Sequence, residues 1–338
     1  MSSTRFTTQK PTTVYEWCQP LLQMRDDYTE WECFTHPDPD EEDPPTLDEI
    51  QTLREFAERY DSSDAIPAYA AARKLMSLTD EDRVVDERQN PVVDKGERVS
   101  WLLWDAGMYM PRYQPAILKI VQAIRELPEL ERTEEQICAG RFENKLETWR
   151  SLEAFADIWS EAHMRRWEMR YGSYPYYGWV EFHSACAFNA NHLAAYPPDS
   201  PDSTELTSAL RLMVFALEQD PWTHAQKPLP PRQDHRFTGI ETPSDYIQML
   251  NTDIHAMVPF FEIAGHIIFS FIGKSHLSLL ETLKLSGCNL WQGDSSFSME
   301  RWEFWRKRLQ WASVQDDLME RTRADAQKIL QLMQEIED

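Results

Sequence analysis

The chain has 338 residues, with 34 Lys and Arg against 57 Asp and Glu, which gives a formal net charge of −23. A field of that sign repels phosphate backbones and anionic lipid, so it argues against nucleic-acid and membrane-surface binding. Hydrophobic residues make up 42 % of the chain, enough for a large core, whereas only 10 glycines disfavour turn-dense β-sandwiches and glycine-rich nucleotide-binding folds.

Residues 1–46 are expected to form an N-terminal segment that ends in an acidic, proline-rich linker. A capping box follows at Thr46–Glu49, where the Thr hydroxyl can accept an amide hydrogen bond and the Glu can reach back. Apolar residues then recur at helical spacing, so we expect one helical domain over residues 47–338. Prolines and polar residues predict mobile loops in it near residues 86–97, 197–204 and 221–242.

Long amphipathic segments occupy most of the remaining chain. Apolar and aromatic residues repeat at helical spacing in five stretches, namely 101–110, 115–127, 146–170, 206–218 and 299–336. No run of residues alternates in polarity as a half-buried strand does. The sequence therefore predicts an all-α fold: an irregular multi-helix bundle without significant β-sheet, in which stacking of helix pairs is left open.

The segment 254–272 is nearly apolar and is about long enough to span a bilayer. Ionisable groups are costly in lipid, and this segment contains three of them together with a proline: His255, Pro259, Glu262 and His266. We therefore predict a buried core helix and no membrane partner.

The cysteines and the N-terminus indicate a cytoplasmic protein. The five cysteines are widely spaced and include no Cys-x-x-Cys pair, which disfavours both a disulfide framework and a cysteine zinc site. The first residues lack the basic and then apolar pattern of a secretory signal. We expect reduced thiols in a soluble chain.

Two basic clusters, at residues 165–170 and 301–308, interrupt the acidic background. Both lie among Trp and Glu residues on predicted helices. We therefore expect solvent-exposed helix faces with ion pairs between neighbouring turns, and no nucleic-acid partner.

Three ionisable residues share one stripe of the predicted helix at 254–272. Steps of seven and eleven residues bring His255, Glu262 and His266 to within about 20° of one another around the helix axis. Two histidines and a carboxylate are a known metal-ligand set, but His255 and His266 would lie about 16 Å apart on a straight helix. We predict no metal and no cofactor here, and a buried Glu–His hydrogen bond instead.

Acid–base chemistry would need side chains from several segments. His can act as a general base or a metal ligand near neutral pH, and Glu can share that work. The candidates for such a pocket are His183, His192, Glu262 and His266.

Residues 171–179 concentrate four Tyr and one Trp around two glycines. These rings could form an aromatic wall for a flat or cationic ligand. The alternative is a turn between helices whose rings cover the edge of the core. The ligand-binding candidates are Tyr174, Tyr176, Tyr177 and Trp179.

Three pairs of stretches carry a family resemblance. They are 101–106 with 115–121, 179–183 with 210–218, and 264–268 with 297–309. Together they are similar to a family of filamentous-fungal proteins known as domain of unknown function 3632, with Ser-Met-Glu-Arg-Trp-Glu-Phe-Trp at 298–305 as the most specific part. The resemblance spans roughly residues 100–330. It implies a helical fold and a fungal source, and it implies no activity and no catalytic residues.

We therefore predict a cytoplasmic helical protein that binds another protein or a small ligand. The alternative is a small-molecule enzyme of fungal specialised metabolism that uses a pocket lined by His and Glu. Convergence of the four acid–base candidates on one cavity would favour the enzyme, and their separation would favour the binding module.

Overall fold

The computed structural model describes residues 45–77, 91–128, 178–197, 204–219, 243–274 and 290–337. Its elements are α2 (Leu47–Glu58), α3 (Ala68–Leu75), α4 (Pro91–Tyr109), the 3-10 helix η2 (Pro111–Tyr113), α5 (Gln114–Arg125), α8 (Gly178–Ala195), α9 (Thr204–Leu217), α11 (Pro243–Ser270), α13 (Met299–Ala312) and α14 (Glu320–Glu337). No β-sheet occurs in these ranges, and the all-α prediction is confirmed.

The observed helices start largely where the sequence predicts. The capping box at the start of α2 is formed, with Glu49 N donating to Thr46 Oγ1 at 3.3 Å and Thr46 N donating to Glu49 Oε2 at 2.8 Å. The stretch predicted over 299–336 is divided into α13 and α14 by residues 313–319. The acidic linker up to residue 44 and the helix predicted over 146–170 lie outside the described residues.

The loop prediction near residues 86–97 is wrong from residue 91 onward, because α4 begins at Pro91. Proline suits the first helical position, since its fixed φ is already helical and its missing N–H would have no partner in the helix. The loop predicted near 221–242 lies wholly outside the described residues, and of the loop predicted near 197–204 only residues 197 and 204 are described.

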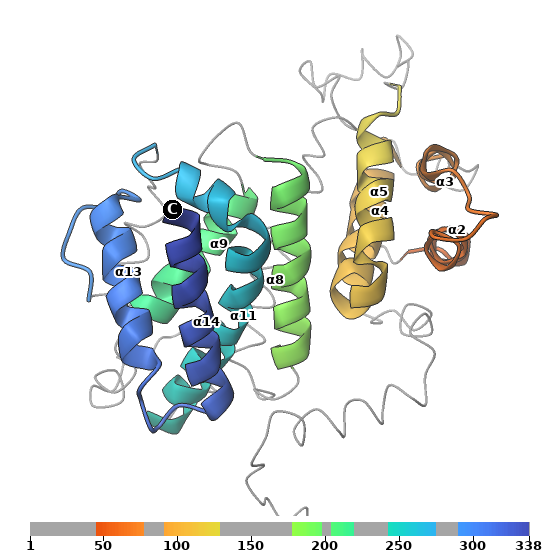
Figure 1. Ribbon diagram of the computed structural model, residues 1–338. Helices are drawn as coiled ribbons and strands as arrows, with labels where there is room; N and C mark the ends of the chain where they lie inside the picture. The colour runs from red at the N-terminus through yellow and green to blue at the C-terminus, as the bar shows by residue number, and fades with distance from the viewer. Residues whose placement is uncertain are drawn as a thin grey trace, which may run out of the picture.

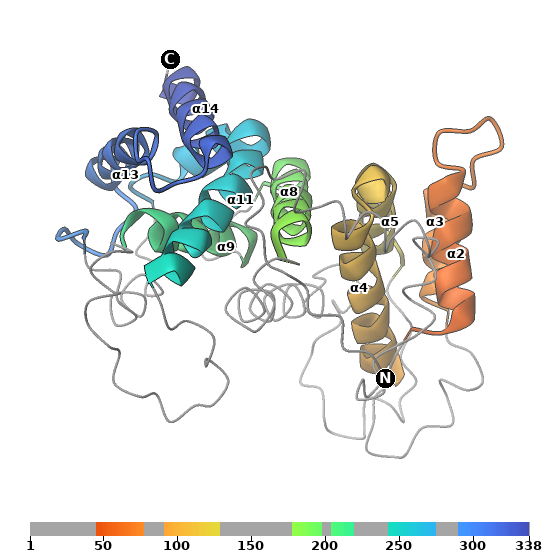
Figure 2. The same ribbon diagram turned by 90° about the horizontal axis from the view of Figure 1, so that it is seen from below.

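The helices pack around two hydrophobic cores that share α8. Figures 1 and 2 show α4 and α5 between α8 and the pair α2 and α3, with α9, α11, α13 and α14 on the opposite side of α8. Ala185 and Phe188 of α8 belong to the core built by α2 to α5, which we call the N-terminal core. Phe182 and Cys186 belong to the core built with α9, α11, α13 and α14, the C-terminal core. A helix covered on both sides is apolar around most of its circumference, as α8 is.

The nearly apolar segment at 254–272 forms most of α11, the longest described helix. It packs against α8, α9 and α14, and its residues Ile254, Met257, Phe260 and Ile268 are buried in the C-terminal core. The prediction of a core helix is confirmed. In the described part of the chain no helix is long and apolar enough to cross a membrane.

Gly107 marks a close approach of α4 to α8. A Cβ atom there would lie 2.3 Å from Cε1 of the buried Phe188 ring, whereas at Gly265 of α11 it would meet the flexible end of Ile336 at 2.4 Å. We expect Gly107→Ala to be less stable than Gly265→Ala by about 1–3 kcal/mol, because a packed ring must shift in the first case only. Both changes gain similar helix propensity, so comparing their urea unfolding curves isolates the packing cost.

Candidate functional site

Two histidines meet where α8 packs against α11. The imidazole rings of His183 and His255 are stacked, with centroids 4.2 Å apart and planes 14° from parallel. His183 Nδ1 lies 3.1 Å from the carbonyl oxygen of His255. Because a carbonyl can only accept, His183 carries its proton on Nδ1.

Helix α14 adds a carboxylate and a guanidinium to this stack. His255 Nδ1 lies 2.8 Å from Asp325 Oδ2, and Arg321 Nε donates to both Asp325 oxygens at 3.2 Å. We call His183, His255, Asp325 and Arg321 the histidine cluster. It ties α8, α11 and α14 together through one continuous chain of polar contacts.

Burial sets the protonation of His183. The pKa of His183 is lowered to about 4, first because burial disfavours the charged ring and second because His255 lies against it. The hydrogen bond to the His255 carbonyl opposes this shift. A general base works best with a pKa near the working pH, so His183 does not suit that role at neutral pH.

The structure does not bring the other acid–base candidates to the histidine cluster. His192 is buried nine residues farther along α8, about 13 Å from His183 at 1.5 Å per residue, and its ring lies 5.0 Å from that of Tyr196. His266 is exposed on α11, about 16 Å along the helix from His255. Glu262 is also exposed and forms an ion pair with Lys328 of α14.

The expected buried hydrogen bond between Glu262 and a histidine is therefore wrong. In this half of α11 the core takes Phe261, Ala264 and Ile268. At 100° per residue these three share one face, and Glu262 and His266 lie on the opposite face, in solvent.

Two predicted sites remain, the metal-ligand stripe on α11 and the aromatic residues at 171–179. In the ranges that the structure describes, no group of three or more His, Cys, Asp or Glu side chains could hold a metal ion, including the stripe of His255, Glu262 and His266. Tyr174, Tyr176 and Tyr177 lie outside the described residues, as does the side chain of Trp179.

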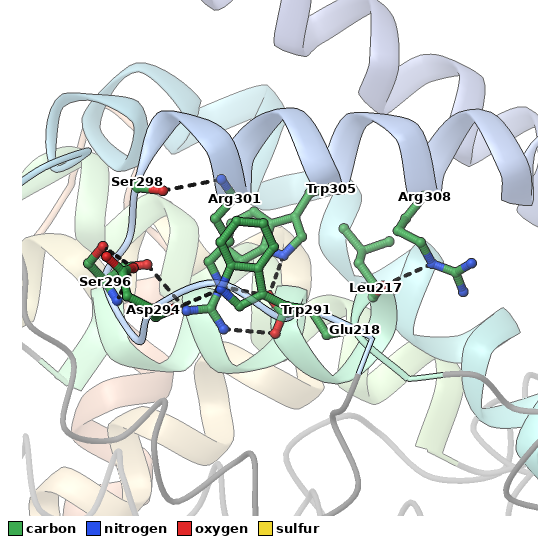
Figure 3. Close-up of polar contacts among 9 residues, drawn as sticks. All are labelled: Leu217, Glu218, Trp291, Asp294, Ser296, Ser298, Arg301, Trp305 and Arg308. Atoms are coloured by element: carbon green, nitrogen blue, oxygen red, sulfur yellow. Dashed lines mark hydrogen bonds and ion pairs between the residues drawn. The ribbon is translucent and has the colours of Figure 1, made fainter.

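A second polar centre, which the sequence analysis missed, lies inside the C-terminal core (Figure 3). Arg301, in the first turn of α13, donates from Nε to Glu218 Oε1 at 2.6 Å and from Nη2 to Glu218 Oε2 at 2.7 Å. Their side chains are 0 % and 1 % exposed. Trp305 Nε1 also donates to Glu218 Oε1, at 2.7 Å. We call this bidentate contact the Arg301–Glu218 pair.

The assignment of Arg301 to an exposed basic face is therefore wrong. At 100° per residue, Arg301 falls on the same stripe of α13 as Trp305 and Leu309, which are buried. That stripe is the signal that could have identified it. Lys307 of the same cluster is exposed, as expected.

Both residues of the Arg301–Glu218 pair make further contacts with their neighbours. The indole rings of Trp291 and Trp305 lie 5.7 and 5.9 Å from the guanidinium carbon, and Arg301 Nη1 donates to Ser296 O at 3.3 Å. The backbone of Leu290 donates to Glu218 O at 3.0 Å. The carboxylate is enclosed, and the pair joins the end of α9 to the start of α13.

Arg308 has a comparable role about two turns farther along α13. It donates to the carbonyls of Leu217 and Gln219 at 3.0 and 3.2 Å, where α9 ends. The last carbonyls of a helix lack partners within it and carry partial negative charge, which an arginine satisfies. Two arginines of the basic cluster at 301–308 thus hold α13 against the end of α9.

A family model described as "Protein of unknown function (DUF3632)" matches residues 102–309, more than half of the chain. The chain belongs to the DUF3632 family. No curated protein and no solved structure matches it. The DUF3632 match includes the whole Arg301–Glu218 pair, but it ends before Asp325 and Arg321 of the histidine cluster. In the most specific part of the resemblance, 298–305, Trp302 and Trp305 pack in the C-terminal core and Arg301 forms the buried ion pair.

Proposed function

We propose that this DUF3632 protein is a non-catalytic helical module that binds another protein or a small ligand. The observation that carries the proposal is the separation of the four acid–base candidates. His183 lies in the histidine cluster, His192 lies more than two turns away on α8, and Glu262 and His266 lie in solvent on α11.

The polar interior of the protein supports the same proposal. The Arg301–Glu218 pair is enclosed by aromatic rings, and Asp325 is engaged by both His255 and Arg321. These groups contribute to packing and orientation, so they are not available for turnover. The net charge of −23 favours a binding partner that carries positive charge.

A small-molecule enzyme is the second candidate, and one observation favours it. The hydrogen bond from His255 Nδ1 to Asp325 holds that imidazole in one tautomer and one orientation, as a general base requires. The cluster is also part-buried, which a reacting centre needs to limit water.

Acylation of the histidines by diethyl pyrocarbonate distinguishes the two candidates without a known substrate. The unprotonated imidazole nitrogen attacks a carbonyl carbon of the reagent and displaces ethyl carbonate, so the rate of acylation depends on the accessibility and the nucleophilicity of that nitrogen. We expect the exposed His266 to be acylated several times faster than His183 and His255, as measured by peptide mass spectrometry of the full chain at neutral pH. This order follows from burial alone.

The enzyme candidate predicts the reverse order for one residue. An activated His255 would be acylated faster than His266 despite its burial, and Asp325→Asn would remove that advantage. Arg54→Met, an exposed change on α2, controls for general effects of substitution. Faster acylation of His255 would contradict the non-catalytic proposal.

A further inference from the structure

We propose that the His183–His255 stack is an acid-sensitive latch that holds α8 against α11 while the His183 ring is neutral and releases it once that ring is protonated. The inference concerns regulation of the fold and goes beyond the binding role proposed above. It depends on the geometry of three helices at one point.

In the described part of the chain, the charged and titratable neighbours of His183 come from two helices. From α11 it faces His255 at a centroid distance of 4.2 Å, and from α14 it faces Asp325 and Arg321. Within the described parts of α4 and α9, which also pack against α8, no charged group affects its pKa. Its neighbours therefore include two groups that can carry positive charge and one carboxylate.

The carboxylate of Asp325 is hydrogen-bonded to His255 and not to His183. Asp325 accepts a hydrogen bond from His255 Nδ1, whereas His183 Nδ1 reaches only a backbone carbonyl. A proton on His255 is therefore balanced by an adjacent negative charge. A second proton, on His183, would place like charges 4.2 Å apart in a largely buried site, and the stack would be strained by their repulsion.

The sign of the pH dependence follows from the two states of the ring. The pKa of His183 is about 4 in the closed contact, against 6.5 for an unperturbed histidine. The latch is therefore fully closed above pH 6.5 and loses stability as the pH falls toward 4. Between pH 7.5 and pH 5 the opening equilibrium constant should rise about thirtyfold from this residue alone.

The position of the latch gives the release a structural consequence. Helix α8 contributes Phe182 and Cys186 to the C-terminal core and Ala185 and Phe188 to the N-terminal core. Separation of α8 from α11 would withdraw Phe182 and Cys186 from the C-terminal core and weaken the link between the two cores, whereas the packing of α11 against α9 and α14 would remain. Acidification would thus loosen the junction before it unfolds either half.

Hydrogen exchange of the full chain tests the latch. Exchange would be measured by mass spectrometry at pH 7.5 and pH 5, corrected for the intrinsic exchange rate, in peptides from α8 and α13. We expect wild-type α8 to lose protection at pH 5 by about thirtyfold while α13 keeps its protection. His183→Asn retains an amide donor toward the His255 carbonyl but cannot be protonated. Helix α8 of this variant should therefore keep its protection at pH 5.

Two further variants make the result specific. His183→Phe keeps a ring against His255 without a titratable group, and its α8 should also keep protection at pH 5, which preserves the test should His183→Asn fold poorly. His266→Asn removes an exposed histidine of α11, the helix that carries His255, and α8 of this variant should still lose protection at pH 5. An equal acid response in wild type and both His183 variants would overturn the proposal, as would loss of protection in α8 and α13 together.

Discussion

Replacement of Arg301 by methionine should lower the free energy of unfolding by about 3–5 kcal/mol, the cost of leaving a buried carboxylate without its partner. Glu218 is 1 % exposed and both its oxygens accept from Arg301, so among the described residues only the indole N–H of Trp305 would still donate to this carboxylate. Urea unfolding followed by far-ultraviolet circular dichroism measures the loss. Lys307→Met, an exposed change six residues farther along α13, should cost less than about 0.5 kcal/mol.

The double variant Glu218→Met with Arg301→Met separates charge from packing. A buried ion pair can often be replaced by apolar side chains of similar volume at little cost, because both desolvation penalties disappear together. We therefore expect the double variant to recover a large part of the stability lost by Arg301→Met alone. If the double variant is as unstable as the single one, the loss arises from the shape of the core and not from the unpaired carboxylate.

Helices were predictable here because their signals are local. The capping box at Thr46–Glu49 involves residues three apart, and both of its hydrogen bonds form. The apolar spacing of 206–218 and 254–272 identifies α9 and the core-forming part of α11. Where a local signal was ambiguous, as for residues 91–97, the prediction of a loop failed, because α4 begins at Pro91.

The polar centres were not predictable in the same way, because their partners are remote in sequence. Arg301 and Glu218 are 83 residues apart, and His255 and Asp325 are 70 residues apart. A run of basic residues usually lies in solvent, and that expectation placed Arg301 on the surface. Only the packing of α13 on the end of α9 shows that one arginine of the run faces inward.

The N-terminal core contains a buried ion pair of the same type. Arg98 of α4 donates from Nε and Nη2 to the carboxylate of Glu49 on α2 at 3.1–3.2 Å, and the two side chains are 7 % and 3 % exposed. Each core thus has an Arg–Glu contact that joins helices distant in sequence. Because such pairs cost desolvation energy, they fix which helices meet more than they add stability.

Arg98→Met should therefore destabilise the N-terminal core by about 3 kcal/mol or more, because Glu49 would remain buried without its guanidinium. The capping bond from Thr46 N would still reach Glu49, so α2 should detach from α4 before its own first turn unravels. Hydrogen exchange should then increase in α2 and α3 and stay unchanged in α13. Arg54→Met breaks an exposed ion pair to Glu58 on α2 and should cost less than about 0.5 kcal/mol, so an equal effect of the two substitutions would show that the Arg98 contact is not buried in solution.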